Sequence, residues 1–126
     1  MIVFVNGEFV ETGLQISVGD RGFLLGDGVF ETIYVESGRP AFLDAHLARL
    51  GKGLATLRID PPADLLRLGD ILARLASQNH MEGAAAARVT ISRGVSARGL
   101  SFPAAGETPP TMLATLVPYA ASAGSA

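Results

Sequence analysis

The side chains able to do chemistry concentrate on one predicted helix. His46 and Arg49 stand three residues apart on it and therefore point the same way. A guanidinium fork matches phosphate oxygens and stays charged, so Arg49 is either an anion ligand or an ordinary surface charge. The helical pattern alone favours the surface charge. Lys52, the only lysine of the chain, is the only side-chain amine that a Schiff base could use.

A glycine-rich segment precedes that helix. Four glycines fall between residues 19 and 28, where they permit positive φ angles and close approach of the backbone to another group. We expect Asp20 to cap a short turn over residues 21–23 by accepting from its N–H groups. Gly26-Asp27-Gly28 is not a dinucleotide-binding motif, because a third glycine is missing and a strand follows where that motif needs a helix.

The acidic residues near this segment suggest structural roles. Glu31 falls on the otherwise apolar face of a strand predicted over residues 29–35. We expect it to hold the glycine-rich segment by accepting backbone N–H groups. His46 is interpreted as a residue that fixes the nearby loop, not as a base. Asp20, Asp27, Glu31 and His46 lack the spacing of metal ligands, so no metal site is predicted.

Periodicity indicates the elements that must position these residues. Asn6-Gly7 between two apolar runs predicts a hairpin, because a type I′ turn needs positive φ at both central positions. Further strands are predicted over residues 14–18, 88–93 and 111–117, and helices over residues 44–59 and 62–79. Asp44 is the expected N-cap of the first helix. Strands segregated from helices predict an α+β fold, an antiparallel β-sheet with two α-helices packed on it.

Composition bounds the class of protein. With 126 residues, 48 % hydrophobic and 17 % charged, the chain is one globular domain or a piece of a larger protein. A net charge of −2 gives no reason to expect nucleic acid or an anionic membrane as partner. The sequence has no cysteine, which excludes disulfides and thiolate metal sites. It also shows no signal peptide and no apolar run of about 18 residues, so we expect a cytoplasmic protein.

Three separated blocks resemble the small N-terminal domain of fold-type-IV pyridoxal-phosphate enzymes, which include D-amino acid transaminases, branched-chain aminotransferases and aminodeoxychorismate lyases. The blocks are D-R-G-F-L-L-G-D-G-V-F-E from Asp20, G-R-P-A-F-L-D-A-H-L-A-R-L from Gly38 and R-V-T-I-S-R-G from Arg88. They follow the family's order and spacing. The resemblance implies that residues 1–118 form this antiparallel domain and that residues 119–126 are a linker or disordered tail.

The resemblance also implies site residues. The arginine of the family's H-x-x-R-L helix binds the phosphate of pyridoxal 5'-phosphate, and here it is Arg49. The aromatic residue before the glutamate of G-D-G-V-F-E lines the substrate pocket, and here it is Phe30. Arg98, in a long loop predicted over residues 94–108, is expected to meet a substrate carboxylate. Leu100 stands where D-amino acid transaminases carry a histidine, and Leu25 where branched-chain enzymes often have a tyrosine.

The family's Schiff-base lysine lies in a second domain, beyond a linker near which this chain stops. We therefore expect no catalytic residue in this chain and no transaminase or lyase activity from it alone. The whole protein is expected to transfer an amino group from an amino acid to a 2-oxo acid, as a homodimer.

Two alternatives to that function stay open. One is an aminodeoxychorismate lyase, and the other is a non-catalytic dimerisation or interaction module that keeps the fold. Exposed apolar residues such as Leu24, Leu25 and Phe30 are expected in either case, and a contiguous apolar patch usually marks an interface. The sequence therefore also predicts self-association.

Overall fold

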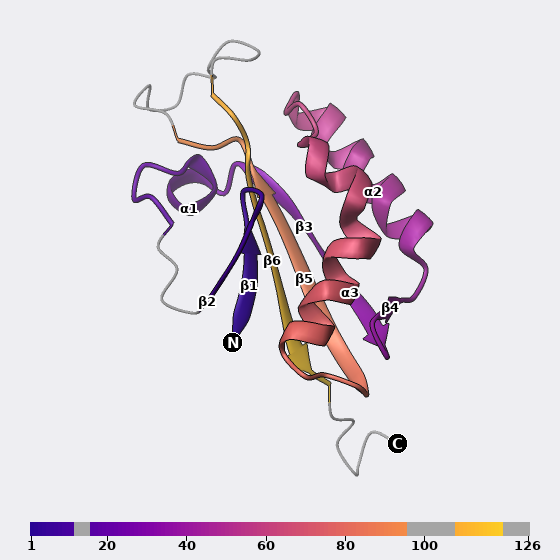
Figure 1. Ribbon diagram of the computed structural model, residues 1–126. Coiled ribbons are helices and arrows are strands. Elements are labelled where there is room, and N and C mark those ends of the chain that lie inside the picture. The colour runs from indigo at the N-terminus through magenta and orange to yellow at the C-terminus, as the bar shows by residue number, and fades with distance from the viewer. Residues whose placement is uncertain (12–15, 96–107, 120–126) are drawn as a thin grey trace, which may run out of the picture.

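The structure is a computed structural model that describes residues 1–11, 16–95 and 108–119. Figure 1 shows its elements, which in chain order are β1 (Ile2–Val5), β2 (Glu8–Glu11), α1 (Arg21–Leu25), β3 (Gly28–Glu36), β4 (Arg39–Pro40), α2 (Leu43–Leu57), the 3₁₀ helix η1 (Ala63–Arg67), α3 (Leu68–Gln78), β5 (Ala84–Ser92) and β6 (Thr111–Pro118).

The strands form one antiparallel sheet, in the order β2-β1-β6-β5-β3-β4. β3 pairs with β5 along its whole length, from Gly28 opposite Ser92 to Glu36 opposite Ala84. β4 pairs only with the last two residues of β3. The first half of β3 therefore has β5 on one side and, among the described residues, no strand on the other.

Helices α2 and α3 cover one face of the sheet (Figure 1). Leu50 and Leu54 of α2 meet Ile33 and Val35 of β3 in one buried cluster. The leucine stripes that predicted the two helices are the faces that they bury, as an apolar stripe at helical spacing requires. The predicted α+β fold, an antiparallel sheet with helices packed on it, is confirmed.

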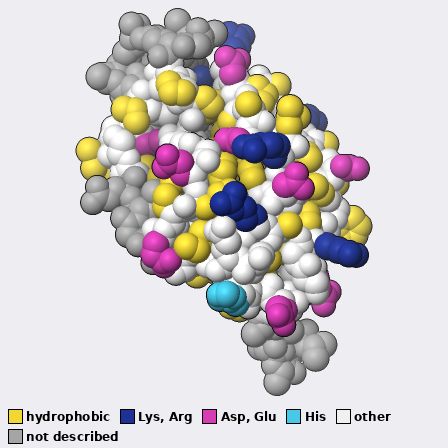
Figure 2. All heavy atoms as spheres, in the orientation of Figure 1, with side chains coloured by type: hydrophobic (Ala, Val, Ile, Leu, Met, Phe, Trp, Pro, Cys, Tyr) yellow, Lys and Arg dark blue, Asp and Glu magenta, His cyan; other side chains and the backbone are white. Residues whose placement is uncertain are grey.

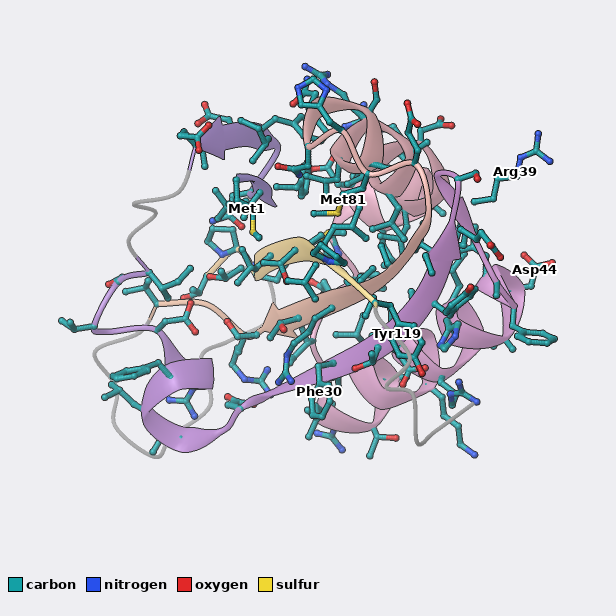
Figure 3. The ribbon with its side chains drawn as sticks, turned by 90° about the horizontal axis from the view of Figure 1, so that it is seen from below. Met1, Phe30, Arg39, Asp44, Met81 and Tyr119 are labelled. Carbon is teal, nitrogen blue, oxygen red and sulfur yellow. The ribbon has the colours of Figure 1, made fainter. Side chains whose placement is uncertain are left out.

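The other face of the sheet carries aromatic side chains that the helices do not cover. Phe30 is 55 % exposed and Tyr119 is 52 % exposed. Tyr34 and Tyr119 make an edge-to-face contact, with ring centroids 5.8 Å apart. Figure 3 shows Phe30 and Met81 on opposite sides of the strands. Phe30 is therefore outside the helix-covered core.

Two turns depend on glycine. Asn6 and Gly7 have φ angles of 46° and 92°, which confirms the predicted hairpin between β1 and β2. Gly94 has a φ of 101°, and a Cβ there would lie 2.1 Å from the carbonyl oxygen of Pro109. Only glycine fits at that position, where the chain leaves β5.

Three local predictions are wrong. Phe42, in the left-handed conformation, precedes α2 without a side-chain cap, so Asp44 is a first-turn residue and not the N-cap. Its charge still lies near the positive end of the helix dipole. Residues 62–79 form a 3₁₀ turn followed by α3, not one helix. Residues 16–18 are not a strand, and the rest of that predicted strand, residues 12–15, lies outside the described residues.

The surface has mixed charge. Figure 2 shows acidic and basic side chains interspersed with apolar ones over the face in view, without a large area of one sign. None of the helices within the described ranges is long and apolar enough to cross a membrane.

Candidate functional site

A groove of about 660 Å³ runs along the unpaired edge of β3, beside α2. The first residues of β3 form one wall and the second half of α2 forms the other; the lining residues are Gly28, Val29, Phe30, Glu31, Arg49, Lys52, Gly53, Thr56 and Leu57. Gly53 lets the two walls approach, because a Cβ there would lie 2.8 Å from Val29 Cγ1. The contact between Val29 and Gly53 therefore sets the distance between the two walls.

An ion-pair cluster spans the groove at one end. Glu31 Oε1 lies 2.8 Å from Arg49 Nε and 2.7 Å from His46 Nδ1. The predicted common direction of His46 and Arg49 is confirmed, since both reach one carboxylate oxygen. The carboxylate itself is mostly buried, with 18 % of its side chain exposed. This arrangement explains the glutamate on an apolar strand face: its partners come from the helix that packs on that face.

The short contact to Glu31 assigns a tautomer to His46. A carboxylate only accepts hydrogen bonds, so His46 Nδ1 bears the proton and donates to Glu31. Arg49 Nη2 lies 3.2 Å from the same nitrogen, which is then a close approach of two donors. Glu31 is the acceptor that holds both.

Glu31 is ionised in this setting. The hydrogen bond from His46 is the largest influence and lowers the pKa of the Glu31 carboxyl. Burial acts in the opposite direction, and the hydrogen bond and charge of Arg49 lower the pKa further. Glu31 therefore carries a fixed negative charge that anchors the guanidinium.

Arg49 keeps donor capacity toward the groove. Its Nε faces Glu31 and its Nη2 faces His46, whereas Nη1 makes no hydrogen bond within the described residues. The side chain is 61 % exposed and lines the groove together with Phe30. A guanidinium held on one side and open on the other is suited to grip an anion. Lys52 lines the same wall and adds a second positive charge.

A second guanidinium, which sequence reasoning missed, stands next to Phe30. Arg88 lies over the Phe30 ring, with its Cζ 4.1 Å from the ring centroid. The two residues come from neighbouring strands, β3 and β5, and Arg88 pairs with Thr32 in the register. Alternation along β5 indicates which of its side chains share a face. Only the pairing of β5 with β3 shows that Arg88 lies beside Phe30.

The glycine-rich segment is held by aspartates. Asp20 caps α1 by accepting from Gly22 N, as predicted. It also accepts from the hydroxyls of Ser92 and Thr111 at 2.6 Å each. The expectation that Glu31 holds this segment through backbone N–H groups is wrong, because Glu31 binds Arg49 and His46 instead. Asp20 and Asp27 hold the glycine-rich segment instead, because both belong to it.

Asp27 forms the most buried ion pairs of the described structure. Arg21 Nε lies 2.8 Å from its carboxylate and Arg93 Nε lies 2.7 Å from it, and all three side chains are less than 10 % exposed. Burial alone would raise the pKa of Asp27, but hydrogen bonds and charge from Arg93 and then Arg21 lower it. Asp27 is therefore ionised beside two buried cations.

Two other predictions concern Arg98 and metal binding. Arg98 lies outside the described residues. No group of residues suited to hold a metal ion occurs in the described part of the chain. Another hollow, of about 550 Å³, is lined by Asn6, Asp64 and the segment from Thr108 to Met112. Its carboxylate, Asp64, is paired with Arg67.

Comparison with known proteins identifies the family. The sequence model of the amino-transferase class IV family matches residues 28–126, and the chain belongs to this family. Aminodeoxychorismate lyase of Bacillus subtilis is 36 % identical over 100 residues, which is 78 % of this chain and 34 % of that protein. The D-alanine aminotransferase of Staphylococcus haemolyticus is 29 % identical over 93 % of this chain and 41 % of that one.

Solved structures agree with this assignment. The 4-amino-4-deoxychorismate lyase of Pseudomonas aeruginosa has a TM-score of 0.76 at 34 % identity, covering 97 % of this chain and 42 % of that one. A hypothetical aminotransferase of Mycobacterium tuberculosis, in a PLP-bound form, has a TM-score of 0.75 at 27 % identity, covering 96 % and 40 %. The chain thus spans well under half the length of these relatives. The resemblance predicted from the three sequence blocks is confirmed.

Proposed function

We propose that this chain supplies the phosphate-holding groove of a pyridoxal-phosphate-dependent class IV enzyme that transfers an amino group from an amino acid to a 2-oxo acid. The observation that supports this most is the geometry of Arg49. Glu31 holds the guanidinium at Nε, and Nη1 makes no hydrogen bond within the described residues. Membership of the family and a PLP-bound structural relative make pyridoxal 5'-phosphate the expected anion.

The groove fits the phosphate of that cofactor. Arg49 would hold a phosphate oxygen, and Lys52 adds charge on the same wall. The exposed ring of Phe30, at the rim, would face the substrate. When bound, the cofactor supplies an aldehyde and an electron-withdrawing ring. The chain's own residues orient the anion: Glu31 fixes the guanidinium, and the contact between Val29 and Gly53 fixes the distance between the walls.

Turnover is not expected from these 126 residues alone. Lys52 is the only side-chain amine, and it sits exposed on the surface of α2. A Schiff-base lysine needs a desolvated position beside the aldehyde, which an exposed position does not provide. We propose that the reactive lysine belongs to a part of the protein outside these residues. A borohydride-reduced adduct on Lys52, together with turnover, would overturn this view.

A second candidate function is aminodeoxychorismate lyase. Two lyases, at 36 % and 34 % identity, support it. The complete protein, supplied with aminodeoxychorismate, would cleave it if the lyase proposal holds. Amino-group transfer from D- or branched-chain amino acids to a 2-oxo acid would favour the aminotransferase. A protein without the absorption band of bound cofactor would point to a non-catalytic interaction module.

We also propose a partner, a substrate ligand and a location. Exposed Leu24, Leu25 and Phe30 support a homodimer, since apolar patches mark interfaces. Arg98 stays a predicted ligand for a substrate carboxylate. The cytoplasm is proposed as the compartment, since a chain without cysteine has no disulfides that need an oxidising environment.

The decisive experiment is a pair of arginine substitutions. Arg49→Gln is compared with Arg67→Gln, because both arginines are similarly exposed, at 61 % and 64 %, and both pair with a carboxylate. The chain and its variants are titrated with pyridoxal 5'-phosphate and with pyridoxal, which lacks the phosphate. We expect Arg49→Gln to weaken binding of the phosphorylated compound by about tenfold or more. If both variants bind pyridoxal 5'-phosphate equally well, the proposal is wrong.

A further inference from the structure

Arg93 joins three segments that are far apart in the sequence. Its guanidinium donates to both carboxylate oxygens of Asp27, with Nε 2.7 Å from Oδ2 and Nη2 3.3 Å from Oδ1. The same group donates to the carbonyls of Leu57 and Arg58, at 2.5 Å and 3.1 Å. Arg93 itself follows β5, Asp27 precedes β3, and the two carbonyls end α2. The Arg93 side chain therefore links the start of β3 to the end of α2.

The two carbonyls are positions where a cation is favourable. The last carbonyls of a helix lack partners within the helix and form the negative end of its dipole. Arg93 satisfies two of them while its other edge faces a carboxylate. The side chain is only 7 % exposed, so these bonds are shielded from water. The backbone adds to the junction, since Arg93 N donates to Asp27 O at 3.0 Å.

This junction lies at one end of the groove. Asp27 directly precedes Gly28, which lines the strand wall, and Leu57 is the last lining residue of the helix wall. The opposite end is spanned by Glu31 and Arg49. Between them, Val29 packs on Gly53. The walls are thus joined at both ends and touch in the middle.

We propose that Arg93 is a positioning residue for the anion-binding groove, which with Asp27 holds the end of α2 against the start of β3 and so keeps Arg49 placed for its ligand. This inference rests on the proposed function, because it takes Arg49 as the phosphate ligand. Without the junction, the end of α2 is free to move from β3. Arg49 lies eight residues before Leu57, about 12 Å along the same rigid helix, so that movement tilts its guanidinium.

The test compares Arg93→Gln with a destabilising substitution far from the groove. Leu72→Ala serves for this, because Leu72 is a fully buried residue of α3 that does not line the groove. Affinity of the chain for pyridoxal 5'-phosphate is measured by calorimetry at a temperature where each variant is folded. We expect Arg93→Gln to weaken binding about tenfold or more, as supporting residues of a site do, and Leu72→Ala to leave it unchanged.

Two further variants separate positioning from general loss of stability. Arg93→Lys keeps the charge but not the fork, so it is expected to bind as weakly as Arg93→Gln. In an Arg49→Gln background, Arg93→Gln is expected to cause no further loss, because its effect acts through Arg49. Equal affinity of Arg93→Gln and Leu72→Ala, or an undiminished effect without Arg49, would overturn the proposal.

Failure of the proposed function would give a different result. In that case the unsubstituted chain and Arg49→Gln bind pyridoxal 5'-phosphate equally, or neither binds it. Amide hydrogen exchange then decides the role of Arg93. We expect Arg93→Gln to speed exchange in residues 28–31 and 54–57 while α3 and β6 keep their rates. Unchanged exchange in the two groove walls would refute the junction itself.

Discussion

Glu31 and Arg49 face each other across the groove, with Arg49 Nε 2.8 Å from Glu31 Oε1, although one belongs to β3 and the other to α2. The strand residue is mostly buried, and the helix residue is mostly exposed. A long exposed side chain normally samples many rotamers, and ordering it costs free energy when a ligand binds. The ion pair with Glu31 already orders Arg49 in the free protein. Less free energy is therefore needed to order it when the ligand binds.

Glu31→Gln tests this preorganisation. The amide keeps the shape of the side chain but loses the charge that holds Arg49 and His46. We expect affinity for pyridoxal 5'-phosphate to fall roughly three- to tenfold, which corresponds to about one fixed side chain. Stability should change little, because the ion pair with the exposed Arg49 contributes about 0–1 kcal/mol and the amide oxygen of glutamine can still accept from His46. Calorimetry and thermal unfolding of the same samples give both quantities, and unchanged affinity would argue against the role of Glu31.

Asp27→Asn tests the buried ion pairs. The pKa of Asp27 is lower in the folded chain than in the unfolded chain, so its contribution to stability is complete above the unfolded pKa and disappears as pH falls through the folded pKa. We expect Asp27→Asn to cost about 3 kcal/mol at pH 7, because it leaves Arg21 and Arg93 with a weakened partner. At a pH below the folded pKa, the two proteins should differ far less.

Urea unfolding at a series of pH values provides the measurement. Asp60→Asn is the control, since Asp60 is exposed and makes no ion pair within the described residues. It should follow the pH profile of the unsubstituted chain. A constant difference between Asp27→Asn and the unsubstituted chain at all pH values would mean that the loss is steric and not electrostatic.

Much of the fold follows from local pattern. The Asn6-Gly7 turn, the strand around Glu31 and the leucine stripe of α2 each appear where periodicity and turn chemistry place them. Each of these signals spans only a few residues. Packing reinforces them, because the apolar faces of the strand and the helix meet in the core. The helix start was less predictable, since Phe42 ends the preceding turn by backbone conformation without a side-chain cap.

The site was only partly predictable, for a physical reason. Arg49 and Phe30 both line the groove, and their roles as cofactor and substrate ligands stay predictions of the resemblance. The partners of Glu31 and Arg93 were missed because they lie 15 to 66 residues away, and an ion pair formed by the packing of two elements leaves no local pattern. One signal was available: a carboxylate on an apolar strand face needs a hydrogen-bonding or charged partner, and the next helix offers His46 and Arg49.

Self-association is expected to use the apolar residues of α1. Leu24 is 58 % exposed there, next to Phe23 and Leu25, whereas Leu66 is 92 % exposed on η1. Leu24→Ser should weaken association measurably in sedimentation experiments, because it removes apolar area from a contiguous patch. Leu66→Ser removes a similar side chain and should have no effect. A monomeric unsubstituted chain, or equal effects of both variants, would contradict this prediction.

Replacing each of two glycines of α2 by alanine is expected to change stability in opposite directions. Apart from its own helix backbone, no heavy atom of the described residues lies within 4 Å of a Cβ added at Gly51, so Gly51→Ala should raise stability by up to about 1 kcal/mol through helix propensity. Gly53→Ala gains the same propensity, but its Cβ would lie 2.8 Å from Val29 Cγ1. Overpacking typically costs about 1–3 kcal/mol, so we expect a net loss of about 1 kcal/mol.

Val29→Ala identifies the cause of that loss. The smaller side chain removes the clash, so the double variant Val29→Ala/Gly53→Ala should be more stable than the sum of the two single effects predicts. It should also recover any affinity for pyridoxal 5'-phosphate that Gly53→Ala loses, because the walls regain their separation. Denaturant unfolding of the four proteins of the cycle gives the coupling. Additive effects would mean that Gly53 does not set the distance between α2 and β3.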